Sequence, residues 1–157
     1  MDKKDKKTKI EYMWSLMCTG STVDKETNNL SLFNIIEQLN LNINKQIKPY
    51  STNGESTRIS MDFNVIVFFR LLEKIKDSFE IRIDFLDPVG ISLNKVEHNV
   101  SIHEGVKNIR LITRFNKMFI SIPGIYDIII GIREVGNKHF KNVGHIPVAV
   151  NIKNNIK

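Results

Sequence analysis

The feature that most constrains the fold is the alternation of apolar and charged residues in segment 79–85, which reads Phe-Glu-Ile-Arg-Ile-Asp-Phe. Successive side chains of a strand point to opposite faces, so this segment predicts a strand with one dry face and one wet face. Seven further apolar-rich segments, separated by turn residues, occur at 10–19, 30–43, 59–72, 91–102, 109–115, 126–132 and 146–152. Eight such segments predict an all-β fold, a single antiparallel β-sandwich of Greek-key type. A closed β-barrel is the alternative.

Residues 31–40 admit two interpretations. Leu32, Ile35, Ile36 and Leu39 stand at i, i+3, i+4 and i+7, which is the spacing of a helix face. The asparagines at 40, 42 and 44 alternate with apolar residues, however, and this pattern suits a sheet better than a helix. We therefore expect a strand, joined to the first one by a hairpin whose polar turn is 23–29.

The length of 157 residues fits one domain, which can bury about 70% of the surface of its unfolded chain. We expect the domain to span 10–152, with flexible tails at 1–9 and 153–157. The single cysteine, Cys18, cannot form an internal disulfide, which favours a cytoplasmic location. The apolar stretch 12–17 after the first lysines is shorter than a secretory signal requires, and no run approaches the ~20 residues of a membrane span.

The formal net charge of +6 lies mostly at the two ends of the chain. Residues 1–9 carry +3 and residues 153–157 carry +2, so the predicted domain carries only +1. A basic tail can bind a polyanion, but it is also the usual composition of a solvated terminus. The charge therefore supports nucleic-acid binding only through the tail.

The longest predicted loop is 45–58, which lacks periodicity and contains Pro49 and Gly54. Loops of this length are often functional or mobile. Lys45, Lys48, Tyr50 and Arg58 could form a small basic and aromatic surface there. An ordinary mobile loop is the simpler interpretation.

The residue types that carry catalysis do not form a recognisable arrangement. The four histidines, His98, His103, His139 and His145, lack the spacing of a zinc site, and no base stands near Cys18 in the sequence. The acidic residues of the predicted loops, Asp24, Glu26, Asp87 and Glu104, are too scattered for a calcium site. We therefore predict no catalytic residue, no cofactor and no metal, and a protein that is not an enzyme.

Three motifs carry a family resemblance over 10–152. They are Asn-Asn-Leu-Ser-Leu-Phe-Asn at 28–34 after Cys18, Phe-Leu-Asp-Pro-Val-Gly at 85–90, and Pro-Gly-Ile-Tyr at 123–126. With these motifs the chain resembles a set of small uncharacterised bacterial β-sandwich proteins, a domain of unknown function of the immunoglobulin-like or C2-like kind. The resemblance implies a fold and assigns no functional residue.

Three functions are compatible with these observations. The first is a non-catalytic interaction or assembly module that binds another protein or itself, because segment 59–72 and the isoleucines at 128–130 are apolar on both faces. The second is binding of nucleic acid or another polyanion through the tail 1–9. The third is a ligand-binding or enzymatic pocket assembled by the fold, with His98 or Tyr126 near a carboxylate. We expect the first, with a protein partner or self-association and no membrane.

Overall fold

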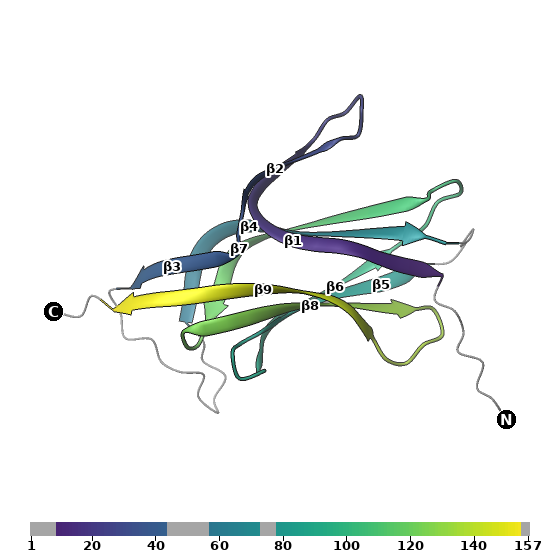
Figure 1. Cartoon of the computed structure of the whole chain (residues 1–157). Coiled ribbons are helices and arrows are strands. Elements are labelled where there is room, and N and C mark those ends of the chain that lie inside the picture. Colours follow the sequence, from purple (N-terminus) through teal and green to yellow (C-terminus); the bar gives the residue numbers. More distant parts are fainter. Residues whose placement is uncertain (1–8, 44–56, 73–77, 155–157) are drawn as a thin grey trace.

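The computed structural model describes residues 9–43, 57–72 and 78–154, which form a sandwich of two β-sheets (Figure 1). The described part of the chain contains nine strands: β1 (Ile10–Val23), β2 (Leu30–Ile35), β3 (Gln38–Ile43), β4 (Thr57–Leu71), β5 (Phe79–Leu86), β6 (Ser92–Val100), β7 (Asn108–Ile120), β8 (Gly124–Glu134) and β9 (Lys141–Asn154). The predicted tail 1–9 and loop 45–58 lie almost entirely outside the described residues.

The first sheet has the strand order β2-β1-β4-β7, and the second has the order β3-β9-β8-β5-β6. The chain leaves the first sheet after β4, forms β5 and β6 in the second sheet, and returns as β7 beside β4. This crossing confirms the predicted sandwich of Greek-key type, and the separation into two sheets excludes the closed barrel for the described residues. All strand pairs are antiparallel except β3 and β9, which run parallel.

Residues 31–40 are extended, as predicted, but segment 30–43 is two strands rather than one. Strand β2 pairs with β1, and β3 pairs with β9 in the opposite sheet. The change of sheet follows Asn34, whose φ of 49° interrupts the extended backbone. Next, Ile36 N donates to Met17 O of the first sheet at 2.8 Å, and Glu37 O accepts from Ala149 N of the second at 3.0 Å. The crossing at 36–37 is therefore held to each sheet by one backbone hydrogen bond.

The core lies between the sheets and consists mainly of isoleucine, valine and phenylalanine side chains. Strand β5 follows the predicted alternation throughout, with Phe79, Ile81, Ile83 and Phe85 buried. Phe63 and Phe115 stack at 5.0 Å between ring centroids, and Phe85 meets both rings edge-on. Aromatic pairs of this geometry add stability beyond the area they bury, so they fix how the two sheets face each other.

Tyr126 joins β8 to the connection that precedes it. Its hydroxyl donates to Ile122 O at 2.7 Å and accepts from Ser121 N at 2.9 Å and Ile122 N at 3.1 Å. In immunoglobulin-like sandwiches, a tyrosine near the start of one strand bonds to the backbone a few residues upstream, an arrangement called the tyrosine corner. Tyr126, near the start of β8, has the same arrangement. The Pro-Gly-Ile-Tyr motif at 123–126 is thus structural.

The Asp87-Pro88-Val89-Gly90 turn is also structural. Gly90 adopts a φ of 87° and its N–H donates to Asp87 O at 2.9 Å, as expected for a turn. The buried Asp87 carboxylate accepts from Val89 N and Ile91 N, and from Ser121 Oγ at 2.8 Å. The carboxylate therefore ties this turn to the tyrosine corner.

Candidate functional site

An apolar groove of about 400 Å³ opens where the chain crosses between the sheets. Three parts of the fold line it: β1 at Ser15–Met17, the crossing segment 35–37, and the β8–β9 pair. The second sheet contributes Ile125, Ile146, Pro147 and Ala149. We call this surface the crossing groove.

Two exposed isoleucines belong to the crossing groove. Ile35 of β2 is 57% exposed and Ile125 of β8 is 61% exposed, although they belong to different sheets. Glu37 is the only charged residue in the lining. Large apolar side chains that gather at one concave surface, with polar residues around it, are typical of an interaction site.

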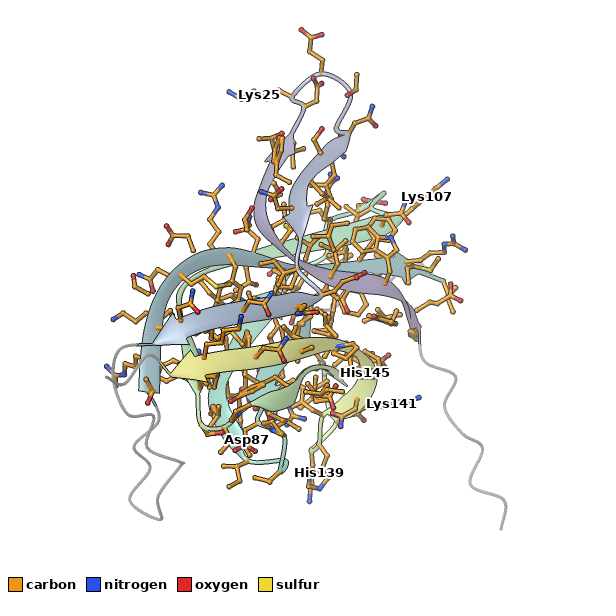
Figure 2. The ribbon with its side chains drawn as sticks, turned by 60° about the vertical axis from the view of Figure 1, so that its left-hand side comes forward. Lys25, Asp87, Lys107, His139, Lys141 and His145 are labelled. Atoms are coloured by element: carbon orange, nitrogen blue, oxygen red, sulfur yellow. The ribbon has the colours of Figure 1, made fainter. Side chains whose placement is uncertain are left out.

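The second apolar face of β4, which we expected to be covered within the fold or by another subunit, is buried within the chain at Ile66. Ile66 points to the outer side of the first sheet, yet it is fully buried. The β1–β2 hairpin is anchored on this side, because Arg110 Nη2 donates to Asn28 O at 3.0 Å and Asn64 Nδ2 donates to Ser21 Oγ at 3.2 Å. Figure 2 shows this hairpin rising from the sandwich with Lys25 at its tip. The apolar character of β4 is therefore explained without a partner.

The other apolar features of the sequence are also mostly covered. Ile128 and Ile130 are in the core, and Ile129 is half-buried on the outer side of the second sheet. Trp14 stacks on Phe68 with 5.4 Å between ring centroids and remains 36% exposed. Ile35 and Ile125 of the crossing groove are each more exposed than Trp14.

The predicted histidine candidates are not brought together. His98 is half-buried and shares a hydrogen bond of 3.0 Å with Thr113 Oγ1 of the opposite sheet. His145 Nδ1 lies 3.2 Å from Asp127 Oδ1 on the exposed side of β9. Figure 2 shows His139 in a different place, on the turn between β8 and β9. The described residues contain no group of three or more metal-ligating side chains.

Cys18 is fully buried, and its thiol donates to Gly20 O at 3.2 Å. Burial raises the pKa of the Cys18 thiol because the thiolate would lose its hydration. A nucleophilic cysteine needs the opposite shift. The position of Cys18 is that of a small core residue.

Two of the four loop acids, Asp24 and Asp87, hold their own turns through hydrogen bonds. Asp24 Oδ1 accepts from Glu26 N, Thr27 N and Thr27 Oγ1 within its own hairpin turn. These hydrogen bonds lower the pKa of Asp24, since they favour the carboxylate. The buried Asp87 carboxylate already accepts hydrogen bonds from Ile91 N of its own turn and from Ser121 Oγ.

One cluster on the outer side of the second sheet had no signal in the sequence. The ring of Phe140 lies between two guanidinium groups, with Arg82 at 4.7 Å and Arg133 at 4.5 Å from its centroid. Arg133 also forms an ion pair with Glu80, which raises the pKa of Arg133 and lowers that of Glu80. Glu80 offsets the charge of Arg133, and Arg82 Nη2 donates to Asn142 Oδ1 at 3.1 Å. Arg82 Nε is buried and has no hydrogen-bond partner among the described residues. The contacts of this cluster run between neighbouring strands, as in a stabilising surface network.

A pocket was expected around His98 or Tyr126, but neither residue lines the crossing groove. Tyr126 is 1% exposed and its hydroxyl is fully used by the tyrosine corner. The basic surface expected from Lys45, Lys48 and Tyr50 lies outside the described residues. Arg58 is described, and its guanidinium lies 5.5 Å from the ring centroid of Phe119.

Comparisons with known proteins extend this description only slightly. No family model matches the chain, and no curated protein does. Among solved structures, the chain is similar to an immunoglobulin-like protein from Pseudomonas aeruginosa, with 8% sequence identity and a TM-score of 0.40. The match covers 92% of this chain and 98% of that one. No helix in the described part of the chain has the length and hydropathy that would let it cross a membrane.

Proposed function

We propose that this protein is a non-catalytic binding module that holds an apolar segment of another protein in the crossing groove. The observation that carries the proposal is the pair Ile35 and Ile125, which are more than half exposed and flank one apolar groove from opposite sheets. Covering them completely would contribute roughly 1 kcal/mol or more each, because full burial of an isoleucine is worth about 1.5–3 kcal/mol. This is enough to make the two residues measurable contributors to affinity.

The lining of the groove defines the chemistry of the partner. Apolar side chains from Leu16, Ile36 and Pro147 favour aliphatic or aromatic groups, and the Glu37 carboxylate favours a neighbouring lysine or arginine. The partner is therefore a segment with an apolar centre and a basic flank. Binding through the N-terminal lysines remains a separate prediction, because residues 1–8 are outside the described structure.

Site-specific photocrosslinking in the host tests this proposal. A benzoylphenylalanine is placed at position 125 in the groove and, as a matched control, at position 135, where Val135 is 69% exposed but lies outside the groove lining. Mass spectrometry of the crosslinked peptides then identifies the segment in contact. We expect one recurring apolar segment with a basic flank from position 125 only.

The identified segment is then made as a synthetic peptide and titrated against purified variants. Ile35→Ser should weaken binding about fivefold to tenfold, since ~1 kcal/mol of apolar contact corresponds to about that ratio. Val135→Ser should leave the affinity unchanged. Equal crosslinking from both positions, or a peptide that binds Ile35→Ser as well as the natural protein, would exclude the groove as the binding surface.

A further inference from the structure

A second cleft, of about 530 Å³, lies on the outer side of the first sheet at the base of the β1–β2 hairpin. Its lining comes from three strands: Thr19–Ser21 of β1, Asp62–Asn64 of β4 and Arg114–Asn116 of β7. The volume falls within the roughly 300–1,000 Å³ of small-molecule sites. We call this surface the polar cleft.

The backbone explains why a cleft forms there. The register between β4 and β7 shifts between Ser60 and Phe63, so the pairing is irregular beside Asp62. Such bulges redirect side chains and are frequent next to binding sites. On the β1 side, Gly20 contributes only backbone to the lining.

Two charged groups in the polar cleft are not neutralised by each other. Neither the Asp62 carboxylate nor the Arg114 guanidinium takes part in the ion pairs found among the described residues, and both side chains are exposed. An arginine can hold a carboxylate or phosphate through two parallel hydrogen bonds. A carboxylate can accept hydrogen bonds only, so Asp62 suits hydroxyl groups.

The uncharged groups fit the same kind of ligand. Asn64 is 7% exposed and its Nδ2 donates to Ser21 Oγ, which leaves the Ser21 hydroxyl hydrogen free to donate. Asn116 offers a second amide with both a donor and an acceptor. Phe63 is buried, and the half-buried ring of Phe115 is already stacked on Phe63 with 5.0 Å between centroids and meets Phe85 edge-on. Neither ring is free for a neutral sugar to stack on, so the affinity must come mainly from the charged groups.

We propose that the polar cleft binds a small hydroxylated anion, a sugar acid or a sugar phosphate, with Arg114 holding the anionic group and Asp62 accepting from a hydroxyl. This site is separate from the crossing groove and does not depend on the function proposed there. The polar cleft combines a guanidinium and a carboxylate that form no ion pair with two amides. These groups match a ligand that carries both an anionic group and hydroxyl groups better than they match a simple anion or a neutral sugar.

The test is a two-dimensional amide NMR titration of the purified full chain with four probes: glucuronate, glucose 6-phosphate, glucose and inorganic phosphate. We expect glucuronate or glucose 6-phosphate to shift the amide resonances of 19–21, 62–64 and 114–116. The probe that causes the shifts shows whether the cleft prefers a carboxylate or a phosphate. Glucose and inorganic phosphate should bind at least about tenfold more weakly, since each lacks one of the two recognised groups. Inorganic phosphate binding as tightly as the hydroxylated anions would overturn the assigned ligand class.

Three variants then assign the contacts. Arg114→Gln should weaken the preferred probe about tenfold or more, and Asp62→Asn should weaken it by a smaller factor while leaving inorganic phosphate unaffected. Lys107→Gln removes an exposed cation outside the cleft and should change nothing. No shifts at the cleft with any probe, or shifts that persist in Arg114→Gln, would refute the proposal. Because Ile35→Ser leaves the cleft intact, the two proposals fail independently.

Discussion

Replacing Gly144 with alanine should destabilise the protein through one identifiable clash. A Cβ atom at this position would lie 2.3 Å from Cζ and 2.6 Å from the hydroxyl oxygen of Tyr12. The Tyr12 ring cannot move freely, because it meets Phe69 edge-on and its hydroxyl is 2.8 Å from Ser15 Oγ. Overpacking of this kind costs about 1–3 kcal/mol, and the short distances place the expected loss at the upper end of that range.

Urea unfolding of four proteins measures this effect: the natural chain, Gly144→Ala, Tyr12→Ala and the double variant. If the clash is with Tyr12, removing the ring relieves it, and the double-mutant cycle should give a coupling of about 1–3 kcal/mol. Gly20→Ala is the control, since its Cβ would find only ordinary contact at 3.7 Å from Phe33. A Gly144→Ala protein as stable as the natural one, or losses that simply add in the double variant, would refute the reasoning.

Three more predictions follow from single contacts. Tyr126→Phe should lower the free energy of unfolding by about 1–3 kcal/mol in urea titrations, since buried backbone groups of 121–122 lose their partner, and a loss no larger than that of Tyr12→Phe would contradict this. Phe140→Leu should lower the free energy of unfolding by about 1–2 kcal/mol, because it removes two cation–π contacts. An unchanged urea midpoint would show that these contacts do not stabilise the fold. The pKa of Asp24 lies below its ordinary value of 3.8, so the carboxylate stabilises the hairpin turn above that pH, and the contribution is lost as the pH falls through the folded-state pKa. A carbon-13 titration of the Asp24 carboxyl checks the direction, and a midpoint at or above 3.8 would contradict it.

Local patterns were sufficient to predict the strands and their inward faces. The alternation in 79–85 predicted both β5 and its buried face, because successive side chains of a strand point to opposite faces and the sequence repeats with the same period of two. The turn at Asp87–Gly90 was predictable for the same reason, since proline and glycine act on the backbone of their own residues. Relations between distant segments were not predictable in this way.

The division of 30–43 between two sheets shows where local patterns fail. The half-buried residues of β2, Leu30 and Leu32, stand at even positions, whereas Leu39 and Leu41 of β3 stand at odd positions. The apolar pair Ile35-Ile36 between them hides where this change occurs. The change depends on the left-handed backbone of Asn34 and on hydrogen bonds to Met17 and Ala149, the latter more than 100 residues away. The parallel pairing of β3 with β9 follows from that crossing and could not be predicted before it was known.

The same distinction explains why the sequence did not reveal the crossing groove and left open what covers the second face of β4. The sequence shows that β4 is apolar on both faces, but it does not show that Ile66 is fully buried within this chain. Conversely, Ile35 and Ile125 look like ordinary strand residues, and only the crossing at 36–37 brings both to one groove. Exposed apolar surface lowers solubility, and this chain buries the second apolar face of β4 at Ile66. The isoleucines that it leaves uncovered are therefore the place where we expect a partner to bind.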